Sequence, residues 1–195
     1  MTGGRRAISA LVLAPGAGAS SDHSALVAID RALAPKGVRV VRIDFPYRVA
    51  GRRVPDRQGV LVSTVEAAAR QLASDMRLSQ ERVALGGRSM GGRMCSIAVA
   101  QGLPAAALVL VSYPLHPPGK PERLRVEHFS AITVPCLFVS GTRDPFGTPA
   151  ELEEATAAVA GPVSHVFCDN GDHGLRRRDE EVAAIVSDWV LTLEA

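Results

Sequence analysis

The segment Gly87-Arg88-Ser89-Met90-Gly91 constrains the fold of this chain more than any other. It follows the apolar run 83–86 and precedes the apolar stretch 94–100, which is typical of a buried helix. A serine at such a junction of strand and helix adopts a strained backbone conformation that exposes its hydroxyl group. Glycine is needed on both sides because a Cβ atom there would collide with the neighbouring strand or helix. The pattern therefore predicts a nucleophile elbow with Ser89 at its tip.

Apolar runs and helical segments alternate along the rest of the chain. Several runs are short and rich in β-branched residues, which is typical of parallel strands buried between two layers of helices. We expect strands at 7–14, 38–44, 82–87, 107–112, 134–140 and 163–168. We expect helices at 21–35, 58–77, 90–101, 149–160 and 178–193, and a short one at 121–129. The prediction is an α/β fold with a mostly parallel six-stranded sheet.

The length of the chain fits one domain of this kind. Its 195 residues, 47% of them hydrophobic, suffice to bury a full core, so a single domain is expected over residues 1–195. Only about twenty residues separate the strands expected at 107–112 and 134–140. That length is too short for a large lid, so the site at the sheet edge is expected to be open to water.

A serine hydroxyl is a weak nucleophile until a histidine removes its proton, and the histidine needs a carboxylate that fixes its tautomer. The strand expected at 134–140 runs into a polar turn that contains Asp144, and the strand at 163–168 runs into a loop that contains His173. Groups that follow parallel strands meet at one edge of the sheet, where ligands bind in open α/β folds. We predict Ser89 as nucleophile, His173 as base and Asp144 as the acid that orients it.

Other interpretations exist for each of these residues. Ser89 and Asp144 could be ordinary turn residues, since Asp-Pro sequences favour turns. Asp172 adjoins His173, but neighbouring side chains in an extended loop point apart, which makes it the poorer orienting acid. Four other histidines compete for the role of base: His23, His116, His128 and His165.

Acyl transfer also requires two backbone N–H donors for the oxyanion. Met90, the residue after the serine, supplies the first. The second is expected from the glycine-rich turn 15–20, and we assign it to Ala17. The same turn could be a plain connection or hold a phosphate at a helix N-terminus, but it lacks the lysine of a nucleotide-binding loop.

Substrate contacts are expected from apolar residues that follow the strands, namely Phe45, Tyr113 and Phe146. An arginine cluster after the second strand could also bind a substrate carboxylate by bidentate pairing, although solvated or paired arginines are commoner. The cluster consists of Arg48, Arg52, Arg53 and Arg57.

Composition excludes several other classes of protein. A net charge of +2 without a nucleic-acid motif implies no nucleic-acid partner. The three cysteines, in apolar runs and without metal-like spacing, indicate buried thiols and a reducing compartment, so a cytoplasmic location is expected. Residues 5–19 mimic a signal peptide, but cleavage there would remove the first strand, which we therefore expect to be retained. No segment approaches the length of a membrane span, and no cofactor is implied.

Segments longer than the elbow carry a family resemblance. They are Gly86 to Arg93, Asp44-Phe45-Pro46-Tyr47, Gly51 to Asp56, Gly141 to Gly147 and Gly171-Asp172-His173. The chain resembles the small α/β-hydrolases related to dienelactone hydrolase, most of all the KANSL and testis-expressed hydrolase-like branch. The resemblance implies the same Ser89, Asp144 and His173 site. This chain departs from the family pattern at Pro15-Gly16, where many hydrolases have His-Gly.

The activity expected from these observations is that of a cofactor-free serine hydrolase. It would cleave small carboxylic esters or related acyl compounds through an acyl-enzyme intermediate. A thioesterase or a peptidase would use the same triad. A hydrolase-like interaction module with little turnover is the alternative outside enzymes, because a fold by itself does not establish an activity. The sequence leaves the oligomeric state open.

Overall fold

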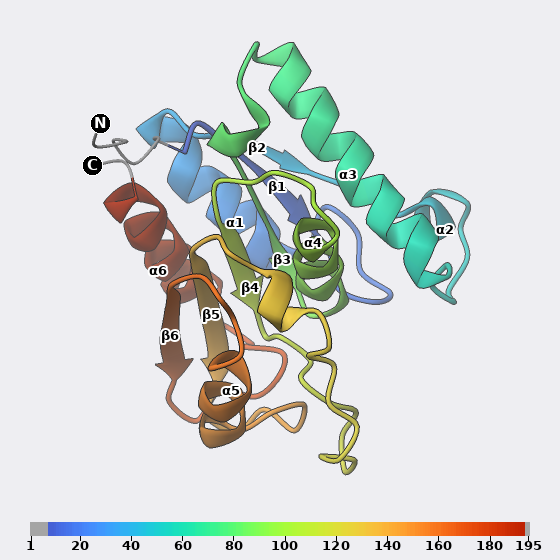
Figure 1. Cartoon of the computed structure of the whole chain (residues 1–195), viewed down its shortest axis with the longest axis vertical. Coiled ribbons are helices and arrows are strands. Elements are labelled where there is room, and N and C mark those ends of the chain that lie inside the picture. The colour runs from blue at the N-terminus through green and yellow to red at the C-terminus, as the bar shows by residue number, and fades with distance from the viewer. Residues whose placement is uncertain (1–7, 194–195) are drawn as a thin grey trace.

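A six-stranded parallel sheet forms the centre of the molecule, with strand order β2-β1-β3-β4-β5-β6. The computed structural model describes residues 8–193 (Figure 1). The strands are β1 (Ala10–Ala14), β2 (Arg39–Arg42), β3 (Val83–Arg88), β4 (Leu108–Val111), β5 (Cys136–Gly141) and β6 (Val163–Cys168). The predicted six-stranded sheet flanked by helices is confirmed; residue 7 of the first expected strand lies outside the described residues.

Helices cover both faces of the sheet (Figure 1). They are α1 (Ser24–Leu33), α2 (Pro46–Val49), α3 (Gln58–Asp75), α4 (Met90–Ala100), α5 (Pro149–Thr156) and α6 (Asp179–Thr192). Helices α1 and α6 pack together on one face, and α3 and α4 on the other. Within residues 8–193, no helix combines the length and the hydropathy needed to cross a membrane.

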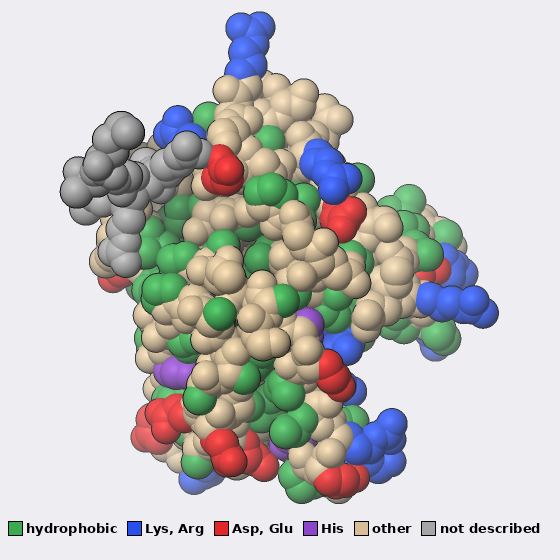
Figure 2. Space-filling view, in the orientation of Figure 1, with side chains coloured by type: hydrophobic (Ala, Val, Ile, Leu, Met, Phe, Trp, Pro, Cys, Tyr) green, Lys and Arg blue, Asp and Glu red, His purple; other side chains and the backbone are tan. Residues whose placement is uncertain are grey.

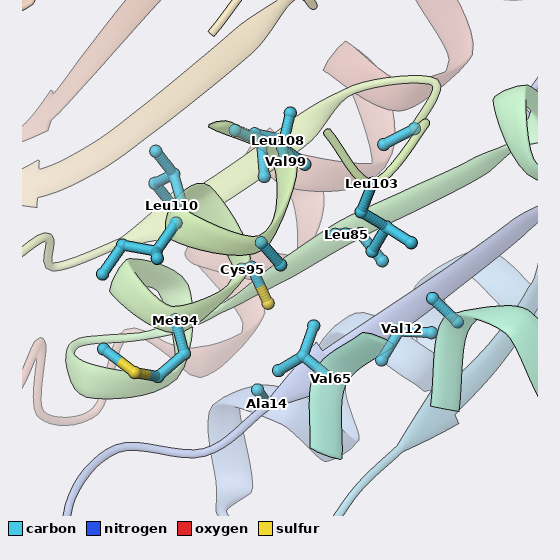
Figure 3. Close-up of a cluster of buried hydrophobic side chains, with 14 of the residues drawn as sticks. Val12, Ala14, Val65, Leu85, Met94, Cys95, Val99, Leu103, Leu108 and Leu110 are labelled. Atoms are coloured by element: carbon cyan, nitrogen blue, oxygen red, sulfur yellow. The ribbon is translucent and has the colours of Figure 1, made fainter. Parts of the chain in front are cut away.

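The core consists of two apolar clusters, one on each face of the sheet. Successive side chains of a strand point to opposite faces, so Leu11 and Leu13 join one cluster while Val12 joins the other. Figure 3 shows the second cluster, where Val12 and Leu85 from the sheet meet helices α3 and α4. This packing on both faces explains why the inner strands β1 and β4 are apolar throughout rather than alternating.

The strand order places a topological switch point at the carboxyl ends of β1 and β3. These strands are neighbours, but the chain runs from β1 to β2 on one side and then crosses to β3 on the other. Loops that leave two such strands diverge, and ligands of open α/β sheets bind between them. The loop 15–20 follows β1 and the elbow follows β3, so both lie at this switch point.

One predicted helix is absent from the structure, and one helix of the structure was not predicted. The prediction of a short helix at 121–129 was wrong, because the segment forms turns and then the 3₁₀ helix η3 (Phe129–Ala131). The Arg125 N–H donates to the Leu115 carbonyl (2.8 Å), and the Tyr113 hydroxyl donates to the Arg125 carbonyl (2.8 Å). These contacts use the backbone groups that a helix would need. Helix α2, which was not predicted, follows β2.

Candidate active site

Ser89 occupies the sharp turn between β3 and α4. Its backbone angles, φ 50° and ψ −118°, lie in a sparsely populated region, and its N–H donates to the Val111 carbonyl (2.8 Å). The turn presses against the end of β1: a Cβ atom on Gly91 would lie 2.6 Å from the Pro15 carbonyl oxygen, and one on Gly87 would lie 2.8 Å from the Gly92 nitrogen. The spacing of the glycines is therefore a steric requirement of this turn.

The side chains of Ser89, His173 and Asp144 form a continuous chain of hydrogen bonds. His173 Nε2 lies 2.9 Å from Ser89 Oγ, and His173 Nδ1 lies 2.7 Å from Asp144 Oδ2. An ionised carboxylate only accepts hydrogen bonds, so the proton of the neutral imidazole resides on Nδ1. Nε2 is then left as the acceptor for the serine hydroxyl. The structure thus brings together the three residues singled out in the sequence.

The two carboxylates beside His173 have different surroundings. Asp144 is 3% exposed, and its second oxygen, Oδ1, accepts the Phe146 N–H (2.8 Å). Asp172 has a half-exposed side chain, 3.8 Å from Arg176 Nε. The carboxylate that contacts the imidazole is therefore the buried one, with both oxygens used.

The loops that carry Asp144 and His173 are tied to each other. The Asn170 N–H donates to Thr142 Oγ1 (2.8 Å), and the Arg143 N–H donates to the Gly171 carbonyl (2.8 Å). These bonds join residues that precede the acid to residues that precede the histidine. The distance between imidazole and carboxylate is thereby fixed by backbone contacts as well as by the side chains.

The loop after β1 is held from the side of β2 and α2. The Gly18 N–H donates to the Tyr47 hydroxyl (2.9 Å), while Asp44 accepts both the N–H and the hydroxyl of Ser21 (2.8 Å each). Because Asp44 holds Ser21 in the loop, α1 begins at Ser24 rather than at residue 21, with His23 as its N-cap. The sequence analysis used residues 44–47 only as part of the family resemblance. It did not predict that they anchor this loop.

The amides of Ala17 and Met90 are the two donors predicted for the oxyanion. Met90 is the first residue of α4, and Ala17 lies in the exposed turn after β1. Within the described part of the chain, neither N–H donates a hydrogen bond. Both N–H groups therefore remain unused by the described residues.

Two of the three residues expected to line a substrate site belong to the core instead. Phe45 is 0% exposed and Tyr113 is 1% exposed, the first stacked on Tyr47 and the second packed against Phe129. Both follow strand ends, but their side chains turn inward to fill the space between sheet and helices. Phe146 is half-buried and lies on the imidazole of His173, with 4.1 Å between the ring centroids.

Arg88, between Gly87 and Ser89, is a site residue that the sequence analysis missed. Its Nη2 donates to the His173 carbonyl oxygen (2.8 Å), and its Nη1 would lie 3.3 Å from a Cβ atom on Gly16. Burial lowers the pKa of the Arg88 guanidinium, while Asp144, Asp172 and Asp179 act in the opposite direction. The only sequence signal was a charged residue at the end of an otherwise apolar strand.

The arginine cluster after β2 is only partly paired. Arg52 forms an ion pair with Asp56 (2.7 Å). In the described portion of the molecule, Arg48, Arg53 and Arg57 form no ion pair. Figure 2 shows Lys and Arg side chains projecting over the α2 region of Figure 1. Arg53 and Arg57 are exposed, as solvated arginines would be.

The other four histidines lie outside the hydrogen-bonded chain and have partners of their own. His23 caps α1, His128 bonds Ser96 (2.8 Å), and His165 bonds Thr156 (2.9 Å). His116 lies 3.5 Å from Glu151. No cluster of three or more His, Cys, Asp or Glu side chains suited to a metal ion occurs among residues 8–193.

Comparisons with known proteins agree with this architecture. Dienelactone hydrolase from Anabaena variabilis superposes with a TM-score of 0.77 at 20% identity, covering 95% of this chain and 87% of that one. An alpha-beta serine hydrolase homologue from Coxiella burnetii superposes with a TM-score of 0.74 at 19% identity, covering 94% and 86%. At such identities the likeness concerns the fold.

Sequence comparisons add a local match and a family. Epoxide hydrolase A of Mycobacterium tuberculosis is 36% identical over 64 residues, which are 32% of this chain and 20% of that relative's length. The family model described as "Alpha/beta hydrolase domain" matches residues 7–189, nearly the whole chain. The chain therefore belongs to the alpha/beta hydrolase domain family.

Proposed function

We propose that this protein is a serine hydrolase that cleaves small carboxylic esters or related acyl compounds. The observation that carries the proposal is the hydrogen-bonded chain from Ser89 through His173 to Asp144, with the serine at a strained elbow. Membership of the alpha/beta hydrolase domain family supports it. Within that family, we assign the chain to the branch that resembles the KANSL and testis-expressed hydrolase-like proteins.

The reaction would proceed through an acyl enzyme. His173 Nε2 takes the proton of Ser89 as Oγ forms a bond to the substrate carbonyl carbon. The resulting oxyanion accepts hydrogen bonds from the Met90 and Ala17 amides. The imidazolium then protonates the leaving oxygen as its bond to carbon breaks. A water molecule, deprotonated by the same histidine, releases the acid and restores the serine.

A small substrate is proposed because the segment between β4 and β5 forms no large cap. The residues between β4 and β5 contain only the three-residue helix η3, and they pack against the core through Phe129. The site residues themselves remain partly exposed, with the His173 side chain 18% accessible. Such a site contacts the acyl group near its carbonyl and offers little apolar surface to a long chain.

The test is hydrolysis of a short-chain ester by the purified protein and by Ser89→Ala. Loss of the nucleophile should lower turnover by about 10³-fold to 10⁶-fold. Circular dichroism and the melting temperature should stay near those of the wild type, because the change deletes one partly exposed hydroxyl. Ser63→Ala, on the face of α3, is a matched control that should retain full activity. Equal activity of Ser89→Ala and the wild type would overturn the proposal.

A further inference from the structure

The side chain of Arg88 points away from helix α4, toward the sheet face that α1 and α6 cover. Successive residues of a strand alternate between the two faces. Leu85 belongs to the apolar cluster under α3 and α4, whereas Ala84 belongs to the cluster under α1 and α6. Arg88 lies an even number of residues from Ala84 and pairs in register with Val111, which belongs to the same cluster as Ala84. Its guanidinium therefore lies on the face opposite to the helix of the elbow.

On that face, the guanidinium lies between two of the loops that form the site. Its Nη2 donates to the His173 carbonyl oxygen (2.8 Å), and its Nη1 would lie 3.3 Å from a Cβ atom on Gly16. In the part of the chain that the structure describes, the bond from Arg88 is the only hydrogen bond of the His173 backbone. The backbone of the proposed base is thus held directly by the residue that precedes the proposed nucleophile.

The loop that carries His173 needs such support, because its backbone is strained. Leu175 and Arg177 have φ of 46° and 61°, in the left-handed region that residues with a side chain rarely adopt. Such conformations persist only where the surrounding structure holds them. The backbone hydrogen bonds to the loop of the acid end at Gly171, two residues before the histidine. Arg88 supplies the contact at the histidine itself.

This contact is unfavourable for the charge of Arg88. Burial lowers the pKa of its guanidinium. Among residues 8–193 it forms no ion pair, so its side chain donates to the His173 carbonyl and not to a carboxylate. A partly buried cation without a carboxylate partner adds little to stability. Departures of this kind from the rules of stability are expected where a residue serves a function.

We propose that Arg88 is a positioning residue that anchors the backbone of His173 to the elbow. Because Arg88 adjoins Ser89, one hydrogen bond connects the loop of the base to the turn of the nucleophile. Without this bond the histidine loop would move away, and the 2.9 Å distance between Ser89 Oγ and His173 Nε2 would lengthen. The inference rests on the proposed function for its catalytic meaning, whereas the anchoring can be measured without turnover.

The first experiment measures amide hydrogen exchange by NMR in the folded wild type and in Arg88→Met. Methionine keeps the length of the side chain but removes the N–H donors. The reporter is the Leu175 N–H, which donates to the Asp172 carbonyl (3.1 Å) across His173. Its exchange should accelerate by about tenfold or more, because a hydrogen bond from a charged donor is lost. The N–H of Leu85, in the sheet, should exchange as in the wild type.

The second experiment measures ester hydrolysis by the same variant. In Arg88→Met, kcat should fall by about tenfold to a hundredfold with KM unchanged, because a displaced base slows proton transfer while substrate binding stays intact. Arg88→Lys retains a charged donor and should stay within about fivefold of the wild-type kcat. Recovery by lysine separates loss of the hydrogen bond from loss of packing. Where Arg88→Met does not fold, Arg88→Gln, whose shorter side chain lacks the reach, carries both measurements.

Arg70→Met is the matched control for the loss of a positive charge. Arg70 is an exposed residue of α3 that pairs with Glu66 (3.6 Å). This variant should keep both the exchange rate of the Leu175 N–H and the kcat of the wild type. An equal fall of kcat in Arg70→Met would assign the effect to net charge and overturn the proposal.

The two experiments distinguish failure of this inference from failure of the proposed function. Unchanged exchange of the Leu175 N–H in Arg88→Met would overturn the anchoring, whether or not the protein cleaves esters. Faster exchange with unchanged kcat would overturn the positioning role, and so would a raised KM with unchanged kcat. Faster exchange in a chain that neither cleaves an ester nor is labelled at Ser89 would support the anchoring and contradict the proposed hydrolase.

Discussion

The two aspartates near His173 differ by their surroundings rather than by their chemistry. Asp144 is nearly inaccessible and uses both oxygens, one on His173 and one on the Phe146 amide. Asp172 is half-exposed and adjoins Arg176. A buried carboxylate held on both oxygens can fix the orientation of an imidazole, whereas an exposed one is free to rotate.

Substitution of these two aspartates should therefore have very different effects on kcat. Asp144→Asn should reduce kcat by about 10⁴-fold, because an amide can stabilise the wrong tautomer and cannot compensate the imidazolium charge. Asp172→Asn should change it by less than about threefold, as for an exposed charge. Steady-state ester hydrolysis measures both. A greater loss in Asp172→Asn would mean that the orienting acid has been misassigned.

For single residues, the sequence predicts the location in the fold better than the direction in which the side chain points. Ser89, Asp144 and His173 follow strands whose ends share one sheet edge, so their proximity follows from the topology. Phe45 and Tyr113 also follow strands, yet both side chains lie in the core. Whether an apolar residue after a strand turns inward depends on the helices that pack there, which a single sequence does not reveal.

Among the elements, the elbow is the one with the least steric freedom. A Cβ atom on Gly91 would overlap the carbonyl groups of Ala14 and Pro15, which belong to a fixed strand end rather than to a flexible side chain. A Cβ atom on Gly59, in the first turn of α3, would meet no atom within 4 Å. The two glycines make a matched pair for substitution by alanine.

Gly91→Ala should destabilise the fold by about 2–3 kcal/mol, because the strand and the helix must move apart. Gly59→Ala should leave stability unchanged or raise it by up to about 1 kcal/mol, since alanine favours a helix over glycine. Chemical denaturation of both variants compares them directly. Similar stabilities for the two would contradict the steric account of the elbow.

The segment between β4 and β5 determines how much of a substrate the protein can cover. A long acyl pocket would add about 0.8 kcal/mol for each buried methylene group, which raises kcat/KM steeply with chain length. This segment forms turns and the three-residue helix η3 rather than a long helical cap. We expect esters with roughly two to six acyl carbons to be preferred, without a rate increase at a lipid surface.

A series of nitrophenyl esters of increasing chain length measures this preference. A continuing rise in kcat/KM beyond about eight carbons, or a jump in rate when the substrate forms micelles, would show that the segment covers the site. The helix wrongly predicted at 121–129 illustrates the limit of sequence here. Its propensity was overridden by tertiary hydrogen bonds between Arg125 and the residues just after β4.

For the whole molecule, the alternation of strands and helices predicts the sheet and the edge where the site forms. It does not predict the contacts between loops, such as Tyr47 with Gly18 or Arg88 with His173. These contacts join residues far apart in sequence and depend on the exact course of each loop. They nevertheless fix the geometry on which the proposed chemistry depends.

Stability of the molecule should also depend on the protonation of a histidine outside the site. Burial, with a smaller effect of Arg93, lowers the pKa of His128 to about 4 from its ordinary value of 6.5. The unfolded chain therefore binds this proton at a higher pH than the folded one. The stability from neutral His128 is fully present above about pH 6.5 and is lost as the pH falls toward 4.

His128→Gln removes this titration while keeping a polar side chain near Ser96. Between pH 7 and pH 5, the wild type should lose on the order of 1 kcal/mol more unfolding free energy than the variant, after allowance for solvent screening. Urea denaturation at the two pH values gives the difference. Equal losses of unfolding free energy in the two proteins would contradict this account, because the loss would then not depend on the protonation of His128.

The most direct test of the central claim is covalent labelling by a fluorophosphonate, followed by intact-mass and peptide mass spectrometry. Only a serine activated by its neighbours reacts at an appreciable rate. The account predicts one adduct on the wild-type chain, located on Ser89, no adduct on Ser89→Ala, and unimpaired labelling of Asp172→Asn. An unlabelled wild type, or an adduct on any other residue, would contradict the account.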